Sequence, residues 1–132
     1  MKYLCIVYID PATFGALSPE GLAALDEASL AFDRGLHESG QLILAQALQS
    51  IDTATTIRVR DGRLSATDGP FAETTEYLGG FTYIEARDLN EAIEIAGRSP
   101  IAPFGSIEVR PVLDLARIVQ ERREQEDRAR SA

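Results

Sequence analysis

The stretch 68–81 concentrates the side chains of this chain that could do chemistry, and it reads Asp-Gly-Pro-Phe-Ala-Glu-Thr-Thr-Glu-Tyr-Leu-Gly-Gly-Phe. Loops this rich in special residues usually carry function, because a scaffold alone does not require them. Asp68 stands beside Gly69 and Pro70, where partial burial would suit it to act as a general acid or base. The alternative is that Asp68 only stabilises its turn, by accepting hydrogen bonds from the backbone amides that follow.

Two predicted strands add polar groups to this loop. Residues alternate between the faces of a strand, so in 80–86 we expect Tyr83 and Glu85 on the face away from the helices. In 106–112 the polar face holds Glu108 and Arg110. A few polar groups in an apolar concavity are typical of a small-molecule site. The alternative is that the glutamates and Arg110 form ordinary ion pairs at a dimer interface.

The remaining pattern predicts the elements that position these residues. Strands are expected at 2–9, 41–48, 80–86 and 106–112, and Asp61-Gly62 predicts a hairpin turn between 55–60 and 63–67. One helix begins at Ser18-Pro19 and ends near Gly40; the other begins at a capping box of Asp88 and Glu91. A short helix is expected at 113–119. This order favours a ferredoxin-like α+β sandwich with an added β-hairpin.

The first strand is apolar on both faces, which favours a homodimer. Both helices of such a sandwich cover one side of the sheet, so the other apolar side needs a partner. Two sheets packed face to face would bury it, as a dimeric α+β barrel.

The chain also resembles the YciI-like proteins, within them the subgroup named for Asp-Gly-Pro-Phe. The resemblance runs from Met1-Lys2-Tyr3-Leu4 to 108–112 and includes 68–71. It implies the dimeric α+β barrel and a His–Asp active centre whose Asp corresponds to Asp68. Members of this subgroup are often encoded beside alternative sigma factors, which implies a link to regulation.

The histidine of that pair has no counterpart here. The family's His should fall near Ser29, whereas the single histidine, His37, lies in the last turn of the first predicted helix. There it suits the helix dipole and is expected to be structural or exposed. Acid–base chemistry would then rest on Asp68, with Glu73, Tyr83 or Arg110.

Composition limits the possible partners and the compartment. The formal charge of −8 argues against direct nucleic-acid binding, which needs clustered Lys and Arg. No apolar run is long enough for a membrane span or forms a signal peptide, and Cys5 is alone, so a cytoplasmic protein is expected. No pattern of residues in the sequence indicates a metal site or a cofactor. One domain is expected at 1–119, followed by a charged extension at 120–132 that forms either a solvated helix or a disordered tail.

Two functions are compatible with these features. The first is a cofactor-independent enzyme of the lyase or isomerase type, acting on a small anionic or enolisable molecule. In it Asp68 would move the proton, Arg110 would polarise an oxygen, and Tyr83, Glu73 and Glu85 would line the pocket. The second is a non-catalytic ligand-binding or regulatory module with a protein partner in sigma-factor signalling.

Overall fold

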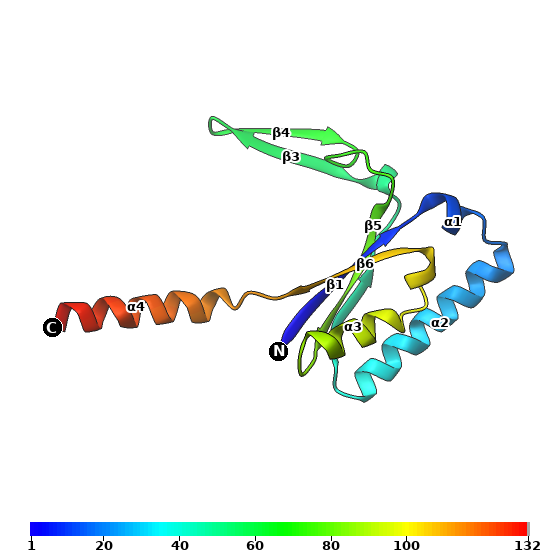
Figure 1. Ribbon diagram of the computed structural model, residues 1–132. Coiled ribbons are helices and arrows are strands. Elements are labelled where there is room, and N and C mark those ends of the chain that lie inside the picture. Colours follow the sequence, from blue (N-terminus) through cyan, green and yellow to red (C-terminus); the bar gives the residue numbers. More distant parts are fainter. Residues whose placement is uncertain (132) are drawn as a thin grey trace.

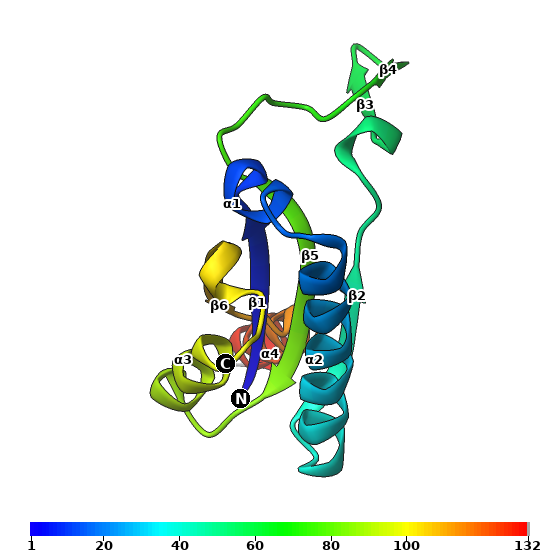
Figure 2. The ribbon, with the colours of Figure 1, turned by 90° about the vertical axis from the view of Figure 1, so that its right-hand side faces the viewer.

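The computed structural model describes residues 1–131 as a mixed α+β fold with two sheets (Figure 1). Strands β1 (Lys2–Ile9), β2 (Leu42–Ala47), β5 (Tyr77–Glu85) and β6 (Gly105–Pro111) form an antiparallel sheet in the order β2-β5-β1-β6. Helices α2 (Pro19–Glu38) and α3 (Leu89–Gly97) cover one face of this sheet (Figures 1 and 2). The order of the major elements is the one that the sequence predicts.

Local sequence signals set the ends of both covering helices. The Ser18 hydroxyl accepts a hydrogen bond from the Gly21 N–H at 3.0 Å, and Pro19 occupies the first turn. Gly40 follows α2 with φ +77°, a conformation that favours glycine. At α3, the Asp88 carboxylate accepts from the Glu91 N–H at 2.9 Å. The helix starts predicted from the sequence are confirmed.

The core lies between the helices and the sheet. In β1 the buried side chains are Tyr3, Cys5 and Val7, which alternate with half-buried Leu4 and Ile6 on the other face. These side chains pack with residues of β5, α2 and α3, among them Ile84, Leu36, Ala92 and Ile95. Ile84 faces the helices and Tyr83 the open side, as predicted.

Strands β3 (Thr55–Arg60) and β4 (Arg63–Asp68) form a separate hairpin that projects beyond the main sheet (Figure 1). Asp61 and Gly62 turn it with φ +53° and +74°, which confirms the predicted two-residue turn. One face of the hairpin is apolar yet exposed, with Ile57 at 64% and Leu64 at 69%. An isolated two-stranded hairpin is marginally stable in water, so this face is a candidate contact surface.

The structure differs from the sequence prediction at several boundaries. Helix α1 (Pro11–Gly15), capped by the Asp10 carboxylate, was not predicted, and short 3-10 turns stand at Ile51–Thr53 and Ala102–Phe104. The last helix, α4 (Leu115–Ser131), is much longer than 113–119, and it has no buried residue. The domain boundary expected after 119 falls inside this helix. Its repeated charged pairs, such as Arg117 with Glu121 at 3.0 Å, support the continued helix.

None of the helices within residues 1–131 combines the length and the apolarity that crossing a membrane requires.

Candidate functional site

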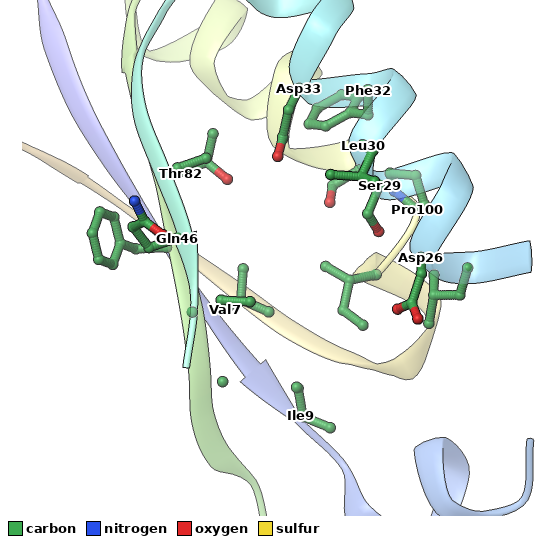
Figure 3. Close-up of a pocket in the computed structure, with 18 of the residues that line it drawn as sticks. Val7, Ile9, Asp26, Ser29, Leu30, Phe32, Asp33, Gln46, Thr82 and Pro100 are labelled. Carbon is green, nitrogen blue, oxygen red and sulfur yellow. The ribbon is translucent and has the colours of Figure 1, made fainter. Parts of the chain in front are cut away.

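A cavity lies between α2 and the sheet, on the face opposite to the predicted site residues Tyr83 and Arg110 (Figure 3). Its volume is about 510 Å³, which is within the usual range for a small-molecule site. Strands β1, β2 and β5 form one wall, α2 forms another, and residues of α1 and of the segment 99–101 complete it. Most of the lining is apolar, including Val7, Ile9, Phe14, Leu25, Phe32 and Ile101.

Two glycines help to shape the sheet wall of this cavity. The β1–β5 register shifts between Val7 and Tyr8, whose partners are Gly80 and Leu78, so Gly79 is the extra residue of a β-bulge. A Cβ on Gly79 would lie 2.2 Å from Ile9 Cδ1, and a Cβ on Gly80 would lie 2.7 Å from the Gln46 carbonyl oxygen. Gly80 therefore requires glycine, because its neighbour is backbone, whereas a side chain at position 79 would have to displace the Ile9 side chain. The pair does more than provide a tight entry into the strand: it leaves part of the wall without side chains.

The polar groups of the cavity come mainly from one face of α2. Asp26, Ser29 and Asp33 follow one another at steps of three and four residues, which places them on the same side of a helix. In Figure 3 the carboxyl group of Asp33 points from α2 towards the sheet, where Thr82 contributes a hydroxyl group. Gln46 also borders the cavity, but its side chain lies on the far side of the strands from α2 (Figure 3).

Asp33 is the carboxyl group best placed for proton transfer in this cavity. It is half-buried, and desolvation by burial raises its pKa above the ordinary value of 3.8. No ion pair involves Asp33 among the described residues. A half-buried carboxyl group that faces a cavity can exchange a proton with a molecule bound there, as general acid–base catalysis requires.

The structure brings three of the sequence-predicted residues, Tyr83, Glu85 and Arg110, to one face of the sheet. Tyr83 and Arg110 both pair with Leu4, from opposite sides of β1, so they share the face away from α2 and α3. Glu108 pairs with Ile6 on the same face, and its Oε1 lies 3.7 Å from Arg110 Nε. Within a single chain this ion pair is exposed and joins two residues of one strand, so the predicted alternative of ion pairs at a dimer interface stays a prediction.

Glu85 lies at the end of β5 and has a local partner. Its Oε1 accepts a hydrogen bond from the Met1 amino group at 2.8 Å. That hydrogen bond, with the positive charge of the amino group, lowers the pKa of Glu85.

Asp68 and Glu73 lie outside the four-stranded sheet. Asp68 is exposed at the end of β4, where it pairs with Thr55, and is therefore in a strand rather than a loop. Backbone groups hold the following turn, since the Gly69 N–H donates to the Ala54 carbonyl oxygen at 2.8 Å. Glu73 is exposed in the segment 69–76, near the hydrogen bond from the Thr74 hydroxyl to the Glu76 carbonyl oxygen. The roles of both carboxylates stay predictions.

The cavity lining includes none of the five residues predicted for the site, namely Asp68, Glu73, Tyr83, Glu85 and Arg110. It does include Ser29, the position where the family resemblance placed a histidine. Sequence reasoning did not identify the two aspartates of the cavity, although a pattern indicated them. Asp26, Ser29 and Asp33 recur at helical spacing beside the apolar stripe of the first predicted helix. His37 is exposed in the last turn of α2, as expected.

The described residues support neither a metal site nor a cysteine nucleophile. Across residues 1–131, no group of three or more His, Cys, Asp or Glu side chains is arranged to hold a metal ion. Burial raises the pKa of the Cys5 thiol to about 11, which makes this cysteine a poor nucleophile at neutral pH.

Known proteins resemble this chain in sequence and in fold. Residues 1–116 match the YCII-related domain. "Uncharacterized protein R00369" of Rhizobium meliloti (strain 1021) is 35% identical over 114 residues, which are 85% of this chain and 92% of that protein. The 5-chloro-2-hydroxyhydroquinone dehydrochlorinase TftG of Burkholderia phenoliruptrix AC1100, in complex with 2,5-dihydroxybenzoquinone, has a similar fold. Its TM-score is 0.52 at 14% identity, over 86% of this chain and 94% of that one.

Proposed function

Because this chain belongs to the YCII-related domain family, we propose that it is a cofactor-independent acid–base enzyme of the lyase or isomerase type. Its site is the cavity beneath α2, and its substrate is a small molecule. The observation that carries this proposal is the half-buried Asp33, whose carboxyl group points into an apolar cavity of about 510 Å³. The similar fold of TftG, a dehydrochlorinase, is consistent with small-molecule chemistry.

In this proposal Asp33 transfers the proton, and two hydroxyl groups orient the substrate. Ser29 lies one turn before Asp33 on the same helix face, and Thr82 stands on the opposite wall (Figure 3). Hydroxyl groups donate and accept hydrogen bonds, so they can hold a carbonyl oxygen or a leaving group. The apolar lining limits water and strengthens these interactions.

Solvent deuterium exchange tests this function without a known substrate. Small carbonyl compounds with acidic C–H groups would be incubated with the protein in D₂O, and loss of the C–H signal followed by NMR. We expect exchange to be catalysed for at least one compound and to fall about 10²–10⁴-fold in Asp33→Asn, the usual contribution of a general acid–base group. Glu27→Gln changes a charge on exposed α2 surface outside the cavity and is the matched control. Binding without exchange would favour the alternative, a ligand-sensing module in sigma-factor signalling.

We also propose a ferredoxin-like homodimer, in which a second copy covers the open face of the sheet. The strand order β2-β5-β1-β6 and the two helices on one face support the ferredoxin-like assignment. Leu4, Ile6 and Phe81 contribute apolar groups to the open face. The β3–β4 hairpin projects on the side of that face, away from α2 and α3 (Figure 1), so its exposed apolar residues are available to a partner there.

The group predicted from the sequence is a second proposed site on this open face. The shared position of Tyr83 and Arg110 opposite Leu4 supports it. In a dimer, the hairpin that carries Asp68 could approach this face. The exchange assay separates the two sites, because Asp33 lines the cavity beneath α2 whereas Asp68 lies in the separate β3–β4 hairpin.

A further inference from the structure

We propose that the cavity beneath α2 binds an organic cation, a protonated amine carried on a compact apolar body, and discriminates against organic anions. This inference rests on the proposed function, since it names the class of ligand for the same cavity. It differs from the expectation of an anionic substrate, which depended on Arg110 on the other face of the sheet.

The charges that line the cavity all have one sign. Asp26 and Asp33 are among its lining residues, and these include no Lys, Arg or His. An anion would therefore meet two carboxylates with no positive group to offset the repulsion, in a space where the effective dielectric constant is lower than in water. A cation would instead provide the counter-charge that the lining does not.

The positions of the two carboxylates suit a ligand with one charged end. Asp26 is exposed, whereas Asp33 is half-buried. An ammonium group could be attracted at Asp26 and then pair with Asp33. The lining includes three aromatic residues, Phe14, Phe32 and Phe81, and the face of an aromatic ring also attracts cations. The apolar remainder of the lining would contact the body of the ligand.

The field around the cavity acts in the same direction. Helix α2 holds five acidic residues (Glu20, Asp26, Glu27, Asp33 and Glu38) against one arginine, Arg34, and the whole chain carries a formal charge of −8. Such a field raises the local concentration of cations and lowers that of anions.

The state of Asp33 predicts how binding depends on pH. Burial raises the pKa of its carboxyl group because the ionised form loses solvation. A bound ammonium group would favour the ionised form and lower that pKa. By linkage, the affinity for the cation should rise as pH increases through the pKa of Asp33 in the free protein.

Three probes of similar size and different charge test the inference: 2-phenylethylammonium, 2-phenylethanol and phenylacetate. Their dissociation constants would be measured by NMR titration at pH 7 and low salt. We expect the ammonium probe to bind about tenfold or more tightly than phenylacetate, with the alcohol between them. In Asp33→Asn this preference should fall to about threefold or less, while Glu27→Gln should retain it. Thermal melts would show that each variant is folded.

The outcomes separate this inference from the proposed function. Equal or tighter binding of phenylacetate would overturn the cation assignment alone, since the cavity would still be a ligand site. An ammonium preference that persists in both Asp33→Asn and Asp26→Asn would also overturn it, because the charge would then be recognised elsewhere. No binding of any probe at millimolar concentration would overturn both proposals. Deuterium exchange that occurs only with anionic compounds would support the proposed enzymatic function but contradict the proposed preference for cations.

Discussion

Thr82 and Tyr83 are neighbours in β5 but belong to two different candidate sites. Thr82 lines the cavity beneath α2, whereas Tyr83 stands opposite Leu4 on the open face with Arg110. The sheet therefore separates the half-buried carboxyl group of Asp33 from Tyr83, Glu85 and Arg110, whereas Asp68 and Glu73 lie outside this sheet. Substitutions on the two faces can be compared directly.

The stability of the Asp33→Asn variant should depend on pH in a defined direction. The pKa of Asp33 is raised in the folded state from 3.8, so the folded protein holds this proton more tightly than the unfolded chain. The resulting stability is fully present below about pH 3.8 and is lost as pH rises through the folded pKa. Asparagine does not ionise, so the variant should be slightly more stable than the parent at pH 7, within about 0.5 kcal/mol. Urea unfolding at several pH values measures this difference. A variant that is less stable at pH 7 would contradict it.

Asp68→Asn should leave the fold intact. Asp68 is exposed, and backbone groups hold the turn after it, so the loss of stability should be about 1 kcal/mol or less. If the site lies beneath α2, the Asp68→Asn substitution should leave ligand binding in the cavity unchanged. A folded Asp68→Asn variant with strongly reduced turnover would instead assign the acid–base role to Asp68, as the sequence predicts. Urea unfolding and the exchange assay provide the two measurements.

The protein should be a homodimer in solution. Light scattering at micromolar concentration should give about twice the 14.4 kDa mass of one chain. Ile6→Glu adds a charge to the open face and should shift the population towards monomer. Ile93→Glu adds the same charge on α3, where Ile93 is 53% exposed, and should not. If the unmodified chain is a monomer, the prediction that a second copy covers the apolar open face is wrong.

Ending the chain after Val119 should change thermal stability very little. No residue of α4 is buried, and its C-terminal part is mostly charged, so few contacts are lost. The melting temperature should fall by less than roughly 5 °C, which corresponds to about 1 kcal/mol for a domain of this size. A larger loss would mean that α4 packs against another surface, such as a second copy.

Cys5 should resist thiol reagents in the folded protein. With a pKa of about 11 and a buried side chain, roughly one thiol in a thousand is ionised at pH 8. Labelling with a chromogenic disulfide at pH 8 should be slow in buffer and rapid in guanidinium chloride. Rapid labelling of the native state would show that β1 opens readily.

Local sequence signals were sufficient for most of the secondary structure. Ser18 and Asp88 cap their helices, and Asp61 with Gly62 turns the hairpin, because each of these interactions involves residues close together in the chain. Strand alternation also predicted that Tyr83 and Arg110 share a face. For the charged residues after 119 the sequence left a solvated helix and a disordered tail as alternatives, and the structure has the helix, which i,i+4 charge pairs support although it has no apolar stripe.

The location of the cavity depended on tertiary structure. Gly79 is a bulge residue only because β1 pairs with β5 in one register, and Asp33 is desolvated only because α2 packs over those strands. Neither fact follows from residues that are neighbours in sequence. The sequence by itself determined which residues carry charge, which strand face each occupies and the order of the main strands and helices. Packing decided which carboxyl group lost its water, because desolvation depends on what lies nearby in space rather than along the chain.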